Sequence, residues 1–307
     1  MSKNAVWLLC SMALHAAVSL PLQAGDFICT TNNDDTLCIV RYSGKGGDLT
    51  IPSSIDGKQV TVIGKGAFYR FGDLISITMP DSITNMEDGS LANVGGDASW
   101  VSWHPRGASP SGAFAGCTNL AKVTMGRQLT VIGDHAFACC SGLKEITVPD
   151  SVARVGRGAF ALCTGLQKAD LGGGVTAIGR QAFDHCKNLK QVRIGGKTAV
   201  IGDWAFHGCV SLENSEIPDS VTGIGHGAFR YCPKLEKVTI GNGVKTIGHY
   251  AFSRCPALKE VFFKGNAPGE VDRNLFFRSP DVTVYYLPQA KGWPERFGDR
   301  RTCFWKE

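Results

Sequence analysis

The stretch "IGDHAFACC" occupies residues 132–140 and sets the pattern of most of the chain. Its skeleton returns as "VGRGAFALC" at 155–163, "IGRQAFDHC" at 178–186 and "IGDWAFHGC" at 201–209, always at the same interval. A fixed period between roughly 20 and 50 residues is the signature of a repeat architecture, in which each unit packs on its neighbours. The sequence therefore predicts a stack of short, similar coils.

Several columns keep this register. The Ala-Phe phenylalanines are Phe68, Phe114, Phe137, Phe160, Phe183, Phe206, Phe229 and Phe252. The gap from Phe68 to Phe114 is twice the regular interval, so the register passes through Leu91 and nine coils fit. Three positions after phenylalanine stand Cys117, Cys140, Cys163, Cys186, Cys209, Cys232 and Cys255. Stacking turns each such column into a ladder within a continuous core.

The segment "LKEITVPDSV" at 143–152 predicts the strand of each coil. Leu143, Ile146 and Val148 are apolar, while Glu145 and Thr147 alternate with them at the period of two that a strand requires. The following Pro-Asp ends the strand. The length of the repeat and this strand pattern are typical of leucine-rich repeats, whose periods run from roughly 20 to 29.

The unit "IGDHAFACCSGLKEITVPDSVARV" resembles the bacterial BspA-like leucine-rich repeat, a family of exported surface proteins, over residues 50–264. It departs from the standard leucine-rich pattern because Pro-Asp-Ser stands where Asn or Cys is usual. The expected fold is a repeat solenoid of leucine-rich repeat type. We expect mainly parallel β-strands, short turns or 3₁₀/helical segments, and β-rich caps at both ends.

The rest of the chain predicts export and capped ends. Lys3, the apolar run at 5–20 and Ala24 have the order of a Sec-type signal peptide, so we assign 1–24 to it. We assign 25–62 to an N-terminal β-hairpin cap, 63–264 to about nine coils with a degenerate second coil at 86–108, and 265–307 to an aromatic-rich C-terminal cap. The mature protein is then secreted or cell-surface-associated, without a transmembrane helix.

The ladder cysteines are expected to be buried free thiols that act as small hydrophobic groups. Cys29 and Cys38 flank the predicted hairpin turn, and a disulfide between them stays open. Cys139 and Cys303 have no evident partner. Within the stretch 132–140, we expect Gly133 to open the turn, and Asp134, His135 and Cys139 to face outward.

The sequence shows no recognisable set of catalytic residues. The net charge of +5 comes without a Lys/Arg run, which argues against nucleic acid binding. His226 and His249 lie one period apart with Asp203 one coil earlier. A metal or pH role there competes with the commoner case of two solvated histidines. We therefore predict no catalytic, cofactor-binding or metal-binding residues and no enzymatic activity.

Binding is expected on the outward positions of the strands, which are polar and variable while the inward columns are uniform. The candidate binding face consists of Thr78, Lys122, Thr124, Glu145, Thr147, Lys168, Asp170, Gln191, Arg193, Asn214, Glu216, Lys237 and Thr239. The irregular segment 87–112 adds Trp103, His104 and Arg106, and Trp and Arg are enriched at binding hot spots. The alternative is that this segment is a decayed repeat.

These features favour a binding or adhesion module for proteins or glycans at or outside the cell surface, with the chain a monomer. The alternative is a purely structural surface or matrix component without a specific ligand.

Overall fold

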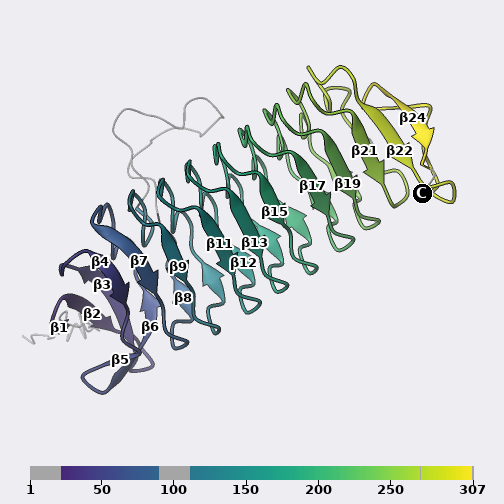
Figure 1. Ribbon diagram of the computed structural model, residues 1–307. Coiled ribbons are helices and arrows are strands. Elements are labelled where there is room, and N and C mark those ends of the chain that lie inside the picture. The colour runs from purple at the N-terminus through teal and green to yellow at the C-terminus, as the bar shows by residue number, and fades with distance from the viewer. Residues whose placement is uncertain (1–21, 90–110, 270, 306–307) are drawn as a thin grey trace, which may run out of the picture.

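The computed structural model describes residues 22–89, 111–269 and 271–305. In this part of the chain it is a β-solenoid whose coils follow one another along a single axis, with the N-terminal and C-terminal coils at opposite ends (Figure 1). The described residues contain no helix, and turns connect the strands. The solenoid of parallel strands is thus confirmed, and its connections are turns rather than 3₁₀ or helical segments. None of the described residues forms a helix that could span a membrane.

Each regular coil contributes a short strand to one row and a longer strand to a second row. The first row is one 12-stranded sheet in the order β1-β2-β3-β6-β8-β10-β12-β14-β16-β18-β20, with β5 paired to β6. Its strands are β1 (Leu22–Ala24), β2 (Phe27–Thr31), β3 (Leu37–Tyr42), β5 (Ser54–Ile55), β6 (Lys58–Ile63), β8 (Asn85–Met86), β10 (Val131–Ile132), β12 (Arg154–Val155), β14 (Ala177–Ile178), β16 (Val200–Ile201), β18 (Gly223–Ile224) and β20 (Thr246–Ile247).

The second row is divided into three sheets in the orders β4-β7-β9, β11-β13-β15 and β17-β19-β21-β22-β24-β23. Its strands are β4 (Gly47–Thr50), β7 (Leu74–Thr78), β9 (Lys122–Thr124), β11 (Glu145–Val148), β13 (Lys168–Leu171), β15 (Gln191–Arg193), β17 (Asn214–Ile217), β19 (Lys237–Ile240), β21 (Glu260–Phe263), β22 (Thr283–Tyr286), β23 (Arg296–Phe297) and β24 (Arg300–Phe304). Pairing is parallel from β11 to β15 and from β17 to β22, and equivalent residues of neighbouring coils lie opposite each other.

The coil expected at 86–108 does not lie between its neighbours. β8 pairs directly with β10, and β7 pairs directly with β9, although two periods separate the members of each pair in the sequence. The rings of Phe68 and Phe114 also stack directly, with centroids 4.8 Å apart. A Cβ added to Gly89 would lie 2.6 Å from the Gly112 nitrogen, so the chain leaves and re-enters the coil at one point. The extra period is therefore inserted within one turn. Its length equals one period, so the sequence keeps the register and resembles an additional coil.

The phenylalanine ladder forms the centre of the core. From Phe68 to Phe252 successive rings are stacked with centroids 4.8–5.4 Å apart. This spacing matches the distance of ~4.8 Å between neighbouring strands. Phe276 adds a further stacked ring 6.0 Å beyond Phe252, and β22 continues the sheet past β21. The solenoid therefore extends one coil into the region that the sequence assigns to the C-terminal cap.

The cysteine ladder fills space and also donates hydrogen bonds. All seven ladder cysteines are free and buried. Each Sγ lies 3.0–3.3 Å from the carbonyl oxygen of the ladder phenylalanine in the preceding coil, as Cys163 does with Phe137. In the last coil the Ser279 hydroxyl replaces the thiol and donates to the Phe252 carbonyl oxygen at 2.9 Å. From Cys117 to Ser279 the column thus carries a small side chain with a donor, whereas Phe71 occupies it in the first coil.

A β-hairpin lies at the N-terminal end of the described solenoid, and a cluster of aromatic side chains lies at its C-terminal end. β2 and β3 form an antiparallel hairpin in which Cys29 pairs with Ile39, and Cys38 with Thr30. Opposite residues in such a pair share a face, so the two cysteines point to opposite faces, and the disulfide left open for them is not formed. At the other end, Trp293 stacks on Tyr286 and packs against Phe263 and Phe297, which closes the core.

Candidate functional site

The predicted binding face lies on seven neighbouring strands, β7 to β19 of the second row. Eleven of its thirteen residues are exposed, and Asp170 and Thr239 are half-buried. Equivalent positions lie side by side, as in the series Glu145, Lys168 and Gln191 across β11, β13 and β15. We call this surface the strand face. Its geometry offers regularly spaced polar groups to an extended partner.

Some charged side chains on the strand face already contact neighbouring side chains, either within the face or next to it. Arg193 contacts Asp170 on the neighbouring strand at 2.5 Å, and Lys264 contacts Glu216 at 3.7 Å. The Lys237 ammonium group lies 4.5 Å from the centre of the Phe262 ring. These contacts reduce the free charge near the C-terminal half of the face. The irregular-segment residues Trp103, His104 and Arg106 lie outside the described residues.

A second surface, which the sequence analysis missed, is formed by the turns that join the two rows. These turns lie at 134–139, 157–162, 180–185, 203–208, 226–231 and 249–254, and we call their outward side chains the turn face. The residues two before and two after the ladder phenylalanine have positive φ in these turns. Although that conformation favours glycine, many of the positions carry larger side chains, among them His135, Gln181, His185, Trp204, Tyr231, Tyr250 and Arg254.

The stretch at 132–140 shows why these turns have their sequence. Gly133 does not have a left-handed φ, and a Cβ there would lie 2.2 Å from the Glu87 carbonyl oxygen, so glycine is needed for close stacking of coils rather than to open the turn. His135 is buried, which corrects the expectation that it faces outward. Its imidazole lies under Gly158 of the next coil, where a Cβ would meet Nδ1 at 2.4 Å.

Aromatic and arginine side chains form a continuous band on the C-terminal half of the turn face. The Arg180 guanidinium lies 4.5 Å from the centre of the Trp204 ring, and Trp204 packs edge-on against His226. The band continues through Tyr250 to Phe277, a residue that is 43% exposed. The sequence indicates this band at the positions between the glycine and cysteine columns, where the residue differs from coil to coil.

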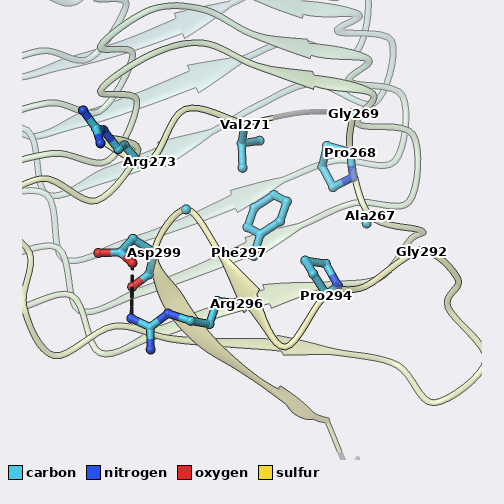
Figure 2. A pocket seen from close by; sticks show the side chains of 11 residues that line it. Ala267, Pro268, Gly269, Val271, Arg273, Gly292, Pro294, Arg296, Phe297 and Asp299 are labelled. Carbon is cyan, nitrogen blue, oxygen red and sulfur yellow. Dashed lines mark hydrogen bonds and ion pairs between the residues drawn. The ribbon is translucent and has the colours of Figure 1, made fainter.

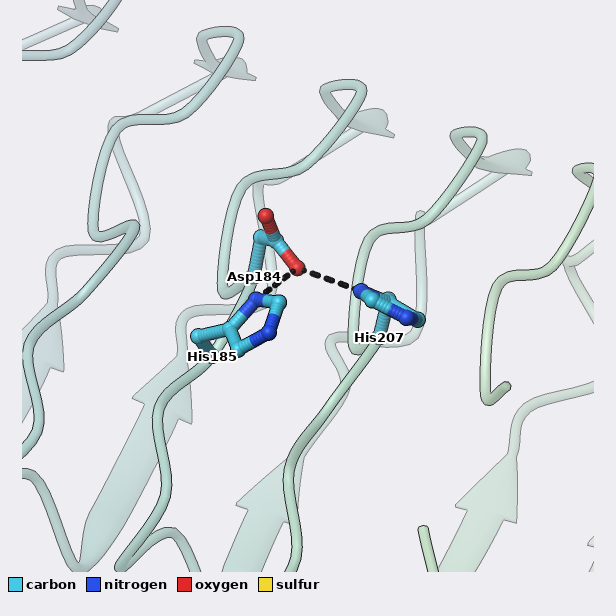
Figure 3. Close-up of side chains that lie close together, drawn as sticks. All are labelled: Asp184, His185 and His207. Atoms are coloured by element: carbon cyan, nitrogen blue, oxygen red, sulfur yellow. Dashed lines mark hydrogen bonds and ion pairs between the residues drawn. The ribbon is translucent and has the colours of Figure 1, made fainter. Parts of the chain in front are cut away.

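Asp184, His185 and His207 form the most concentrated polar cluster on the turn face. The Nδ1 atoms of both imidazoles lie 2.8 Å from the same oxygen, Asp184 Oδ1 (Figure 3). The Asp184 side chain is 3% exposed, while the His185 and His207 side chains are 34% and 26% exposed. Asp184 raises the pKa of His185, and hydrogen bonds from the two histidines hold the pKa of Asp184 below its usual range despite burial.

The cluster could have been found by reading the sequence in columns. Asp184 follows Phe183 and His207 follows Phe206, so the two residues share a position on adjacent coils. His226 and His249 do lie next to each other on adjacent coils, as expected, with tilted rings whose centroids are 6.0 Å apart. Asp203 instead accepts a hydrogen bond from the His226 backbone, and His249 Nδ1 contacts Asp272. That second histidine pair therefore shares no carboxylate.

A shallow hollow of about 580 Å³ lies at the C-terminal end, between the last regular coil and the closing strands (Figure 2). Phe297, Pro268, Pro294 and Val271 supply its apolar lining. Its charged groups are Arg273, Arg296 and Asp299, and the Asp299 carboxylate lies 3.3 Å from Arg296.

Comparisons with known proteins agree with this architecture. The sequence matches the BspA type leucine rich repeat region in segments 48–167, 108–209 and 176–290, which together span most of the chain. No curated protein sequence matches it closely enough to count as a relative.

Several bacterial leucine-rich repeat structures are similar to it. A leucine rich cell surface protein from Faecalibacterium prausnitzii is 20% identical, with 94% of this chain and 95% of that one covered and a TM-score of 0.58. A leucine-rich repeat protein from T. pallidum is 25% identical over 87% of this chain and 86% of that one, with a TM-score of 0.37. The pneumococcal vaccine antigen PcpA is 17% identical over 94% and 100%, with a TM-score of 0.43.

Proposed function

Because this chain belongs to the BspA-type leucine-rich repeat family, we propose that it is an exported binding module for a protein or glycan at or outside the cell surface. The supporting observation is the contrast between its core and its surface. The ladders repeat with little change, while the outward positions on β7 to β19 differ in charge and hydrogen-bonding capacity and remain mostly exposed.

The ligand is proposed to lie along the strand face. Parallel strands place its side chains ~4.8 Å apart, and the N-terminal half presents Lys122, Thr124, Glu145 and Lys168 as exposed groups. Such a surface recognises an extended partner through many hydrogen bonds. The aromatic band of the turn face is the second candidate surface, because Trp, Tyr and Arg are enriched at binding hot spots.

Export is part of the proposal. It is supported by the order of Lys3, the apolar run at 5–20 and Ala24, and by a cell surface protein among the similar structures. We further propose that the module is a monomer, binds no nucleic acid and catalyses no reaction.

Affinity capture with the mature chain, against cell-surface extracts and a glycan panel, tests this function. The strand-face variant Lys122→Glu/Lys168→Glu should lose most of the capture, while the turn-face variant Trp204→Ala/Tyr250→Ala should retain it. The reverse result would move the ligand to the turn face. If the wild-type chain captures nothing from any of these sources, the purely structural alternative is favoured and the binding function is wrong.

A further inference from the structure

We propose that Asp184, His185 and His207 form a binding site for a divalent transition metal ion of the zinc class. The inference is independent of the proposed binding function. It rests on three side chains from two neighbouring coils whose candidate ligand atoms all lie within 4.8 Å of one another.

The ligand chemistry and spacing fit such an ion. Zinc is bound by histidine nitrogen and carboxylate oxygen at ~2.0–2.2 Å, so tetrahedral ligands lie about 3.3 Å apart. The two Nδ1 atoms are each 2.8 Å from Asp184 Oδ1, so a small rotation of both rings opens the required space. Because the rings are partly exposed, water can complete the coordination.

The backbone holds the three residues in this arrangement. Asp184 and His207 occupy the same position on adjacent coils, and the His185 nitrogen donates to the His207 carbonyl oxygen at 2.8 Å. His185 has a φ of 55°, in the left-handed region. Its imidazole contacts the carboxylate of Asp184, the residue immediately before it, as Figure 3 shows. The fold thus provides the arrangement before any ion binds.

The charges also favour a cation. Asp184 is a buried carboxylate in contact with the two imidazoles, and Lys187 is the cation that acts on His185 from its own coil. When an ion binds at Nδ1, a neutral imidazole moves that proton to Nε2, and a protonated one releases it to solvent. The bound state then holds one carboxylate, two neutral imidazoles and the ion. Zinc binding should therefore weaken as the pH falls, because protons compete with the ion for its ligands.

Glycine at position 208 leaves the site open on one side. A Cβ there would lie 3.2–3.3 Å from three atoms of the His185 ring, including Nε2. Gly208 has a φ of 68°, whereas Tyr231 and Arg254 fill the equivalent positions of the next two coils. The coil that faces His185 thus lacks a side chain that would restrict movement of the ring.

Calorimetric titration of the metal-free mature chain with Zn²⁺ tests the proposal, in a Cys139→Ser/Cys303→Ser background that removes the two partly exposed thiols of the described residues. We expect about one equivalent to bind, and His207→Gln and Asp184→Asn each to weaken binding at least ~10-fold. His249→Gln is the matched control, because it alters the histidine pair without a shared carboxylate, and should leave the affinity unchanged.

Three further measurements separate metal binding at this site from folding defects and from binding elsewhere. Circular dichroism should show that each variant is folded, and Zn²⁺ should raise the thermal unfolding temperature of the parent chain but not of His207→Gln. A Co²⁺ complex should have a visible spectrum of nitrogen and oxygen ligands. The proposal would be overturned if the parent chain bound no Zn²⁺, if folded His207→Gln still bound it, or if the Co²⁺ spectrum showed thiolate ligands.

Discussion

Glycine at the position that precedes each turn is required by contact between coils. A Cβ on Gly179 would lie 2.5 Å from the Gly156 carbonyl carbon and 2.7 Å from the Arg157 nitrogen, which are backbone atoms that cannot move separately. The sequence showed that glycine recurs here, but not the reason, because a turn and a close approach both select it.

Gly179→Ala should therefore lower the free energy of unfolding by roughly 1–3 kcal/mol, as overpacking does. The matched control is Gly196→Ala, where an added Cβ meets nothing within 4 Å and φ is not left-handed. That substitution should be neutral or stabilise by up to ~1 kcal/mol, since it restricts the unfolded chain. Chemical denaturation of both variants measures the difference, and equal effects would contradict the close-packing explanation.

Burial of His135 predicts a pH effect on stability. Burial first, and Arg157 second, lower the pKa of His135 from 6.5 to about 4, although Asp134 and Asp88 oppose the shift. The folded pKa is below the unfolded value, so the neutral imidazole contributes stability above pH 6.5 that is lost as the pH falls toward 4. The sequence could not show this, because left-handed turn positions carry buried and exposed side chains alike.

His135→Gln removes this titration, and Gln181 occupies the same left-handed position in another coil. The wild-type chain should lose up to about 3 kcal/mol more stability than the variant between neutral pH and about pH 4. Denaturant unfolding of both proteins across this range measures the effect. A constant difference would show that His135 does not titrate as its burial requires.

The ladder thiols should be unreactive in the folded protein. Burial raises the pKa of Cys117 and of Cys255 to about 12, so little thiolate forms near neutral pH. A thiol reagent should modify Cys139 and Cys303 first, because these two are partly exposed. Denatured, unreduced protein should then expose the seven ladder thiols as well. Failure to detect them after denaturation would mean that they are oxidised.

At the level of the coil, the repeat pattern predicted the strands and ladders but placed a coil at 86–108 between strands that pair directly with each other. A degenerate coil and an insertion of one period give the same spacing, and only the pairing of β8 with β10 separates them. Removing 89–111 would join Asp88 to Gly112. Asp88 then matches Asp134 and Gly112 matches His135, so "MEDGAF" aligns with the turn "IGDHAF".

Deletion of 89–111 should therefore leave the solenoid folded, with a thermal unfolding temperature within about 5 °C of the parent value. The deletion also removes Trp103, His104 and Arg106, so a loss of ligand capture by the folded variant would assign binding to this segment. Retained capture would favour the strand face. Unfolding of the deletion variant would contradict the assignment of the segment as an insertion.

For the whole molecule, the register of the repeat matters more than the number of coils. Solenoid stability is approximately a sum over coils and their contacts, because each coil touches only its neighbours. Each apolar column is continuous on both sides of any internal coil, so removal of one full period brings equivalent surfaces together. A deletion that is one residue shorter than a full period shifts every column of the next coil and turns its strand residues to the opposite face.

Two nearly identical deletions should therefore have different outcomes. Deletion of 145–167 removes one full period, joins Lys144 to Lys168 and should give a shorter, cooperatively unfolding protein with a proportionally smaller denaturant dependence. Deletion of 145–166 stops one position short of a full period and should leave the chain largely unfolded or aggregated. Circular dichroism with urea unfolding measures both. Equal stability of the two proteins would mean that the ladders do not set the fold, since only their register distinguishes the two chains.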